Sequence, residues 1–117
     1  VAGATARRHC GRDATTVAID NLYFKSGAYL NDIIVLIGKV THVGHTSMEV
    51  RVDTYREEQD GTRHPINRAY FVMVAMGDDG KPTPVPSLIL ENDGERMEWD
   101  NAIKRRELRL VRKKEGF

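Results

Sequence analysis

Residues 46–55 carry the clearest β-strand pattern in the chain. Met48, Val50 and Val52 fall on one side of an extended backbone, and the polar residues between them fall on the other. Three further segments have strand character, namely residues 15–24, 33–43 and 68–76. The last two are nearly continuous apolar runs, which is typical of strands that are covered on both faces. Short connections between these segments predict an antiparallel sheet.

Helical patterns occupy the two ends of the chain. Residues 1–10 are rich in small side chains and close with two arginines and a histidine, followed by Gly11, which is the order expected at a helix C-terminus. Residues 91–117 place acids first and bases last, as the helix dipole favours. The first helix is expected to cover one apolar face of the sheet, and a second subunit the other.

The composition is that of a single globular domain. The 117 residues are 40% hydrophobic and 30% charged, and the net charge of +1 argues against a strongly basic nucleic-acid binder. The longest apolar run, residues 33–37, is far too short to cross a bilayer. The one cysteine, Cys10, excludes an intrachain disulfide and fits a reducing, cytoplasmic setting.

Motifs of self-contained active sites are absent from the sequence: there is no GxSxG, HExxH, CxxC or GxGxxG. His42 and His45 flank a glycine, but no third ligand is close in sequence, so no metal site is expected. We expect Cys10 to be a buried structural residue rather than a reactive thiol. Residues 104–114 contain seven bases, which could bind phosphates, but a solvated helix end is the simpler interpretation.

Two short segments carry groups suited to binding a ligand. Residues 44–47, Gly-His-Thr-Ser, offer backbone N–H groups and two hydroxyls beside a tight turn, which can hold a phosphate or a pantetheine amide. Asp20 and Asn21 form a polar pair within a β-rich stretch, where a buried polar group needs a backbone or ligand partner. Each pattern is equally consistent with ordinary turn or strand chemistry.

Taken in order, these segments resemble the hotdog-fold acyl-CoA thioesterases of the cytosolic (brain) acyl-CoA hydrolase type. The resemblance covers about residues 1–90 and rests on residues 1–10, 16–24, 38–50, 68–75 and 80–86. It implies an α+β hotdog fold, in which a curved antiparallel sheet wraps around a central helix. We therefore expect a hotdog domain over residues 1–90 and a charged helical tail over residues 91–117.

The same resemblance implies hydrolysis of a fatty acyl-CoA to a free fatty acid and coenzyme A, with no further cofactor. It implies a cytoplasmic homo-oligomer built from dimers, often a hexamer made of three dimers, with no membrane partner. It places Asn21 and Phe24 near the pantetheine, and Gly44, His45, Thr46 and Ser47 near the phosphates. Arg63 or Arg68 could also pair with a phosphate, and so could basic residues of the tail.

In this family an acidic residue on the central helix activates water or attacks the thioester, and backbone N–H groups near the start of that helix polarise the carbonyl. The position matching this acid precedes Val1, so the N-terminal strand and the first half of the helix are expected upstream. We assign no catalytic residue within residues 1–117 and expect this polypeptide to be inactive alone. Asp13 is expected in a turn and Asp20 on a strand.

Two alternative functions remain open at this point. A hotdog dehydratase acting on acyl thioesters would need a histidine in the helix, and His9 lies at the wrong end. A non-enzymatic domain could instead bind nucleic acid through residues 104–114. Retention on immobilised coenzyme A would favour the thioesterase, whereas binding to single-stranded nucleic acid that weakens steeply with salt would favour the second alternative.

Overall fold

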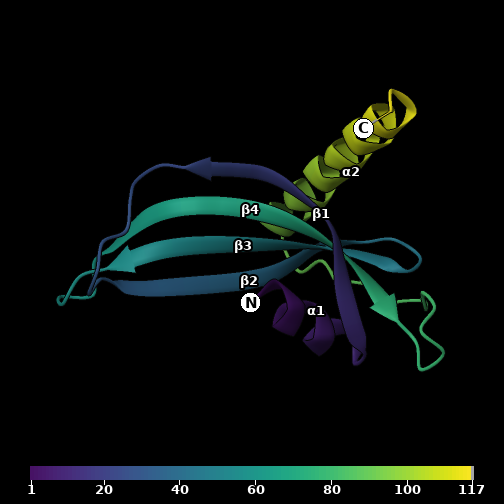
Figure 1. Cartoon of the computed structure of the whole chain (residues 1–117), viewed down its shortest axis with the longest axis horizontal. Helices are drawn as coiled ribbons and strands as arrows, with labels where there is room; N and C mark the ends of the chain where they lie inside the picture. Colours follow the sequence, from purple (N-terminus) through teal and green to yellow (C-terminus); the bar gives the residue numbers. More distant parts are fainter. Residues whose placement is uncertain (117) are drawn as a thin grey trace.

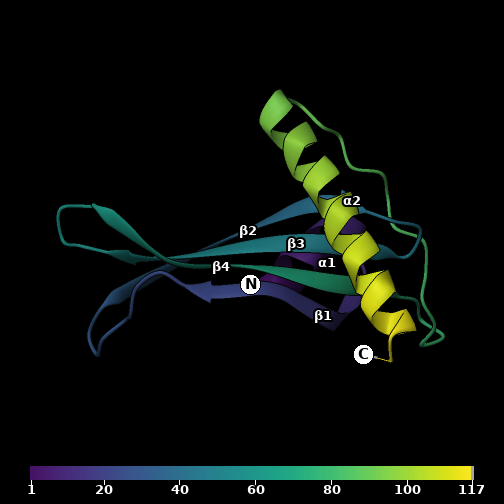
Figure 2. The same cartoon turned by 90° about the horizontal axis from the view of Figure 1, so that it is seen from above.

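A four-stranded antiparallel sheet with one helix against each face makes up the protein (Figure 1; Figure 2). The computed structural model describes residues 1–116, apart from the side chains of residues 21–24. The elements in chain order are α1 (Ala2–Cys10), β1 (Asp13–Phe24), β2 (Ile33–Val43), β3 (Ser47–Glu57), β4 (Arg63–Met76) and α2 (Asp93–Lys114). The strand order β1-β4-β3-β2 and the antiparallel pairing confirm the predicted α+β class.

The boundaries of three strands differ from the sequence-based expectation, and the smallest change is in β3, which runs from Ser47 to Glu57 instead of over residues 46–55. Asp13 opens β1 instead of lying in a turn, because Gly11 takes a left-handed conformation (φ 69°) that ends α1 and reverses the chain within two residues. β4 begins at Arg63, five residues before the predicted start at residue 68. Pro65 lies within this added part, next to a register shift between Thr54 and Tyr55 on β3 that accommodates it.

The core lies between α1 and the inner face of the sheet, which is the face carrying Met48, Val50 and Val52, as predicted. These three side chains are buried and pack with Ala2 and Ala6 of α1. The small side chains let the helix backbone come close to the strands. The closest approach is at Gly38 of β2, where an added Cβ would clash with Oγ1 of Thr5 and lie 3.0 Å from Cγ1 of Val1.

Replacing Gly38 by alanine is expected to lower the free energy of unfolding by about 1–3 kcal/mol, because the added methyl group pushes α1 off the sheet. Gly3→Ala is the matched control, since Gly3 lies in α1, the helix that packs on Gly38, and a Cβ there meets nothing within 4 Å. Alanine at residue 3 should leave stability unchanged or raise it slightly. Urea unfolding measures both variants, and equal midpoints for Gly38→Ala and the wild type would contradict the close approach.

β2 divides into a covered and an uncovered half. Val40 and Thr41 are buried between the two helices, whereas Ile33, Leu36 and Ile37 are 43% to 54% exposed. The expectation that both faces of this strand are covered therefore holds, within this single chain, only for its second half. The first half presents apolar side chains on both faces of an edge strand, an arrangement typical of a surface that pairs with another protein chain.

Candidate functional site

α2 lies against the outer face of the sheet (Figure 2). Ion pairs between charged side chains hold it there. Only Ala102 of this helix is buried. Near the middle of α2, Glu98 accepts hydrogen bonds from Arg51 at 2.5 Å and from the Tyr70 hydroxyl at 3.1 Å. Burial raises the pKa of Glu98, but these two hydrogen bonds and the nearby arginines outweigh it, so that the pKa lies below its usual value.

Glu49 of β3 is the most deeply buried acid in this interface, with only 2% of the residue exposed. Arg105 donates to its two carboxylate oxygens at 2.9 and 2.6 Å, and the Thr41 hydroxyl donates at 2.6 Å. The guanidinium of Arg105 also lies 3.7 Å from the ring centre of Tyr70, a cation–π contact. The lone pairs of the buried carboxylate are therefore satisfied, as its burial requires.

One turn further along α2, Arg109 donates to Asp20 of β1 at 2.6 Å, and Arg112 donates to the same carboxylate at 3.2 Å. The interpretation of residues 104–114 as a solvated helix end is therefore wrong for Arg105 and Arg109, whereas the side chain of Arg112 is 57% exposed. Arg105 and Arg109 face the sheet because its outer face carries buried acids, and an opposite charge within hydrogen-bond distance compensates the burial of each acid.

A groove of about 540 Å³ runs between α2 and the outer face of the sheet. Its apolar lining includes Val17, Val72, Val74 and Leu110, and its polar lining consists of His42, Ser47, Glu49, Arg106, Arg109 and Lys113. Glu49 is paired with Arg105, and Arg109 with Asp20, whereas no carboxylate lies within ion-pairing distance of Arg106 or Lys113 in the part of the chain that the structure describes. The groove therefore combines two unneutralised cations with a paired carboxylate, a hydroxyl and an apolar wall.

The predicted phosphate-binding turn lies at one end of this groove. The N–H of Gly44 donates to the carbonyl of Ser47 at 2.9 Å and closes the turn. The carbonyls of His45 and Thr46 accept from Val85 and Ala75, and neither of their N–H groups has a partner among the described residues. Because its carbonyls are engaged and these N–H groups are free, the turn presents positive dipole ends, which suits an anion.

Gly44 lies where the turn and α2 meet. A Cβ at this residue would stand 2.9 Å from Oγ of Ser47 and 3.7 Å from Nη1 of Arg106. The structure thus brings a guanidinium of the basic tail to the turn that sequence reasoning selected. Arg106 could not be singled out from the sequence, because seven bases occur between residues 104 and 114 and only the rotation of the helix selects among them.

Of the other predicted site residues, Arg63 and Arg68 do not join this groove. Asn21 and Phe24 belong to β1, but their side chains lie outside the described residues. Arg63 pairs with Glu57 at 3.2 Å, and Arg68 pairs with Asp53 at 2.6 Å, away from the turn. Neither arginine is therefore placed to hold a phosphate at residues 44–47.

His42 lines the groove beside Trp99 of α2. The ring centre of His42 lies 4.1 Å from that of Trp99. Burial lowers the pKa of the His42 imidazole; Glu49 opposes this shift, and Arg106 and its neighbours on α2 reinforce it. Among the described residues, no three His, Cys, Asp or Glu side chains gather in a way that could hold a metal ion. None of the described helices combines the length and the apolar character needed to cross a membrane.

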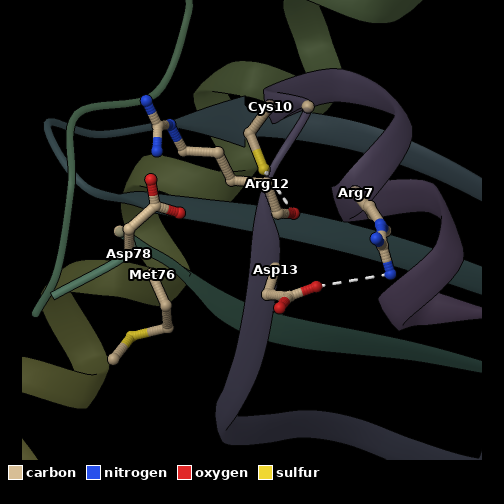
Figure 3. A pocket seen from close by; sticks show the side chains of 8 residues that line it. Arg7, Cys10, Arg12, Asp13, Met76 and Asp78 are labelled. Atoms are coloured by element: carbon tan, nitrogen blue, oxygen red, sulfur yellow. Dashed lines mark hydrogen bonds and ion pairs between the residues drawn. The ribbon is translucent and has the colours of Figure 1, made fainter. Parts of the chain in front are cut away.

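A second hollow, of about 830 Å³, lies at the C-terminal end of α1 (Figure 3). Arg7 and Asp13 form an exposed ion pair of 3.3 Å at its edge, and Cys10 donates to the carbonyl of Arg12 at 3.3 Å. Cys10 is half-buried rather than fully buried as expected, because it lies in the last turn of the helix, beside this hollow. Within the described part of the chain, none of the residues that the sequence predicts to bind coenzyme A lines this hollow.

Comparisons with known proteins agree with this architecture. The profile of the thioesterase superfamily matches residues 1–62. The uncharacterized acyl-CoA thioester hydrolase YkhA of Bacillus subtilis is 34% identical over 115 residues, which are 97% of this chain and 67% of the relative. The chain spans between 63% and 67% of the length of three bacterial relatives.

Two solved structures have the same fold. An apo-hexameric acyl-CoA thioesterase is 37% identical with a TM-score of 0.88, over 95% of this chain and 72% of that one. An acyl-CoA hydrolase from Staphylococcus aureus, solved in complex with butyryl coenzyme A, coenzyme A and coenzyme A disulfide, is 31% identical with a TM-score of 0.89, over 98% of this chain and 71% of that one. These likenesses confirm the predicted hotdog fold, and with the profile match they show that the chain belongs to the thioesterase superfamily.

Proposed function

We propose that the protein hydrolyses acyl-CoA thioesters, and that residues 44–47, Arg106 and Lys113 hold the nucleotide phosphates of coenzyme A. The proposal rests mainly on one observation, the guanidinium of Arg106 beside a turn whose N–H groups are free. A charge-assisted hydrogen bond from a guanidinium to a phosphate is among the stronger polar contacts in proteins. The relatives named acyl-CoA thioester hydrolase, and the coenzyme A complexes of one of them, support the same ligand.

The remaining parts of the substrate need groups other than the phosphate site. The placement of Asn21 and Phe24 near the pantetheine stays a prediction. Coenzyme A enters as part of the substrate and leaves as product, so no other cofactor is required in this proposal. Hydrolysis needs a carboxylate that activates water or attacks the thioester carbonyl, together with N–H groups that stabilise the oxyanion. We place this carboxylate outside residues 1–117, because α1 carries no acidic side chain.

The assembly proposed for the protein is a cytoplasmic homo-oligomer built from dimers, with the hexamer as its largest form. The exposed apolar side chains of the first half of β2 supply a surface that a second copy could cover. Several structural neighbours are hexameric thioesterases. The division into a hotdog domain over residues 1–90 and a tail over residues 91–117 remains a prediction, and the ion pairs of α2 bind this tail to the sheet.

The two alternative functions have less support. A dehydratase would need a histidine directed at the substrate, whereas the ring of His9 lies 2.9 Å from the carbonyl of Pro86 at the C-terminal end of α1. A nucleic-acid-binding domain would need the bases of residues 104–114 to face outward. Three of these bases instead pair with acids of the sheet.

Arg106→Gln is expected to weaken binding of coenzyme A to this chain roughly tenfold, because one charge-assisted contact to a phosphate is lost. Isothermal titration calorimetry at fixed ionic strength measures the dissociation constant. Lys104→Gln is the matched control, since it removes the same charge from an exposed position outside the groove. Failure of the wild-type chain to bind coenzyme A, or equal losses in the two variants, would contradict the proposed site.

A further inference from the structure

We propose that Glu49 is a positioning residue for the nucleotide site: by pairing with Arg105 it fixes the rotation of α2 and thereby delivers Arg106 to the turn of residues 44–47. The inference rests on the proposed function, because it concerns the same phosphate site. It adds a residue that does not bind the ligand itself.

Apolar packing alone does not determine the rotation of α2 about its axis. Ala102 is its only buried residue, whereas Leu108, Leu110 and Val111 are 51% to 62% exposed. Trp99 also contacts the sheet, with its ring centre 4.1 Å from that of His42, but it lies on the turn before Ala102, so residues 104–114 have no buried apolar contact of their own. Directional contacts must therefore set the rotation, and the ion pairs with the sheet are such contacts.

The pair of Glu49 and Arg105 provides this direction. The guanidinium of Arg105 donates two bonds to one carboxylate, which fixes both its distance and its orientation. Thr41 donates to the same carboxylate at 2.6 Å and fixes Glu49 in turn. Since the carboxylate is 2% exposed and lies on a central strand, it is a rigid reference point for the helix.

Helix geometry carries this constraint to the next residue. Successive residues of an α-helix point about 100° apart, so once Arg105 faces the sheet, Arg106 must face the groove on one flank of α2. Arg109, one turn later, pairs with Asp20 at 2.6 Å and holds the same rotation from a different strand. The other groove cation without an acidic partner, Lys113, lies seven residues after Arg106 and therefore on the same side of the helix.

A direct role for Glu49 in holding the phosphates is opposed by its charge. A carboxylate repels a phosphate, and the atoms of this one are engaged by Arg105 and Thr41. Its effect on the ligand must therefore pass through α2. That chain of contacts predicts energetic coupling between Glu49 and Arg106, although the two side chains form no ion pair within the described residues.

A double-mutant cycle tests the coupling. Glu49→Gln, Arg106→Gln and the double variant are compared for coenzyme A binding by calorimetry, at a temperature where circular dichroism shows each variant folded. We expect Glu49→Gln to weaken binding roughly fivefold in the wild-type background and to have almost no further effect once Arg106 is replaced. In the full-length protein, Glu49→Gln should raise KM for a fatty acyl-CoA and leave kcat nearly unchanged.

Asp53→Asn is the matched control. Asp53 lies on the same strand and the same outer face and is 6% exposed. Both of its ion-pair partners, Arg68 and Arg51, belong to the sheet, and Asp53 itself makes no ion pair with α2 within the described residues. It should lower stability and leave coenzyme A affinity within twofold of the wild type. If Glu49→Gln does not fold, Asp20→Asn replaces it in the cycle, with a smaller loss of roughly two- to threefold expected for the less buried pair.

The outcomes separate this inference from the proposed function. If Arg106→Gln weakens binding but the effects of the Glu49 and Arg106 substitutions are independent and multiply, the positioning role of Glu49 is overturned and the proposed site stands. An equal loss of affinity in Asp53→Asn and Glu49→Gln would also overturn it, because both effects would then reflect general destabilisation. Absence of coenzyme A binding in the wild type would overturn the proposed site, and the inference with it.

Discussion

Replacing Arg105 by leucine is expected to lower the free energy of unfolding by about 3 kcal/mol, which is the lower end of the range for breaking a buried ion pair. The loss of stability comes from the Glu49 carboxylate, which remains buried without its partner. Glu49 stays 2% exposed beneath α2 and loses both hydrogen bonds from the guanidinium. Arg109, whose Nη1 lies 3.9 Å from Oε2 of Glu49, compensates part of the charge and keeps the loss from being larger.

A double variant distinguishes an orphaned charge from lost packing. Glu49→Leu combined with Arg105→Leu should be more stable than Arg105→Leu alone, because apolar side chains of similar volume can replace a buried ion pair at little cost. Lys104→Leu, on the exposed side of the same helix, should change stability by less than about 0.5 kcal/mol. Guanidinium unfolding curves give the three values, and a loss below about 1 kcal/mol for Arg105→Leu would show that the pair behaves like a surface salt bridge.

The fold of this chain follows closely from its local sequence patterns. The alternation of residues 46–55 correctly predicts which side chains of β3 enter the core, and the apolar run gives the bounds of β2 as the structure has them. Gly11 ends α1 as its position indicates. These features depend on neighbours within a few residues, and such neighbours are visible in a sequence.

The arrangement of the site depends on contacts between distant residues and was less predictable. Glu49 and Arg105 are 56 positions apart, and Asp20 and Arg109 are 89 positions apart. Local reasoning explained the bases of the tail by the helix dipole, which is a real but weak effect. A usable signal was nevertheless present, because residues 105, 109 and 112 recur at helical spacing on one face and the acids of β3 point outward.

The polypeptide of residues 1–117 is expected to bind coenzyme A but to release no thiol from a fatty acyl-CoA above the uncatalysed background. The resemblance to the acyl-CoA hydrolases implies a catalytic acid on the central helix, whose present part, α1, carries no acidic side chain. The buried acids that the structure describes lie instead on the outer face: Glu49 and Asp53 are paired with Arg105 and Arg68. Asp13 lies at the opposite, C-terminal end of α1, exposed and paired with Arg7.

A missing general base lowers a rate by about 10²–10⁴-fold, and a missing nucleophile removes the covalent route entirely. A spectrophotometric thiol assay with purified chain measures the rate, and calorimetry on the same sample shows whether the binding site is intact. The full-length protein serves as the positive control. Thiol release proportional to the concentration of the 117-residue chain, and abolished by Asp13→Asn, would place the catalytic carboxylate within this sequence and overturn the assignment of that group to another part of the protein.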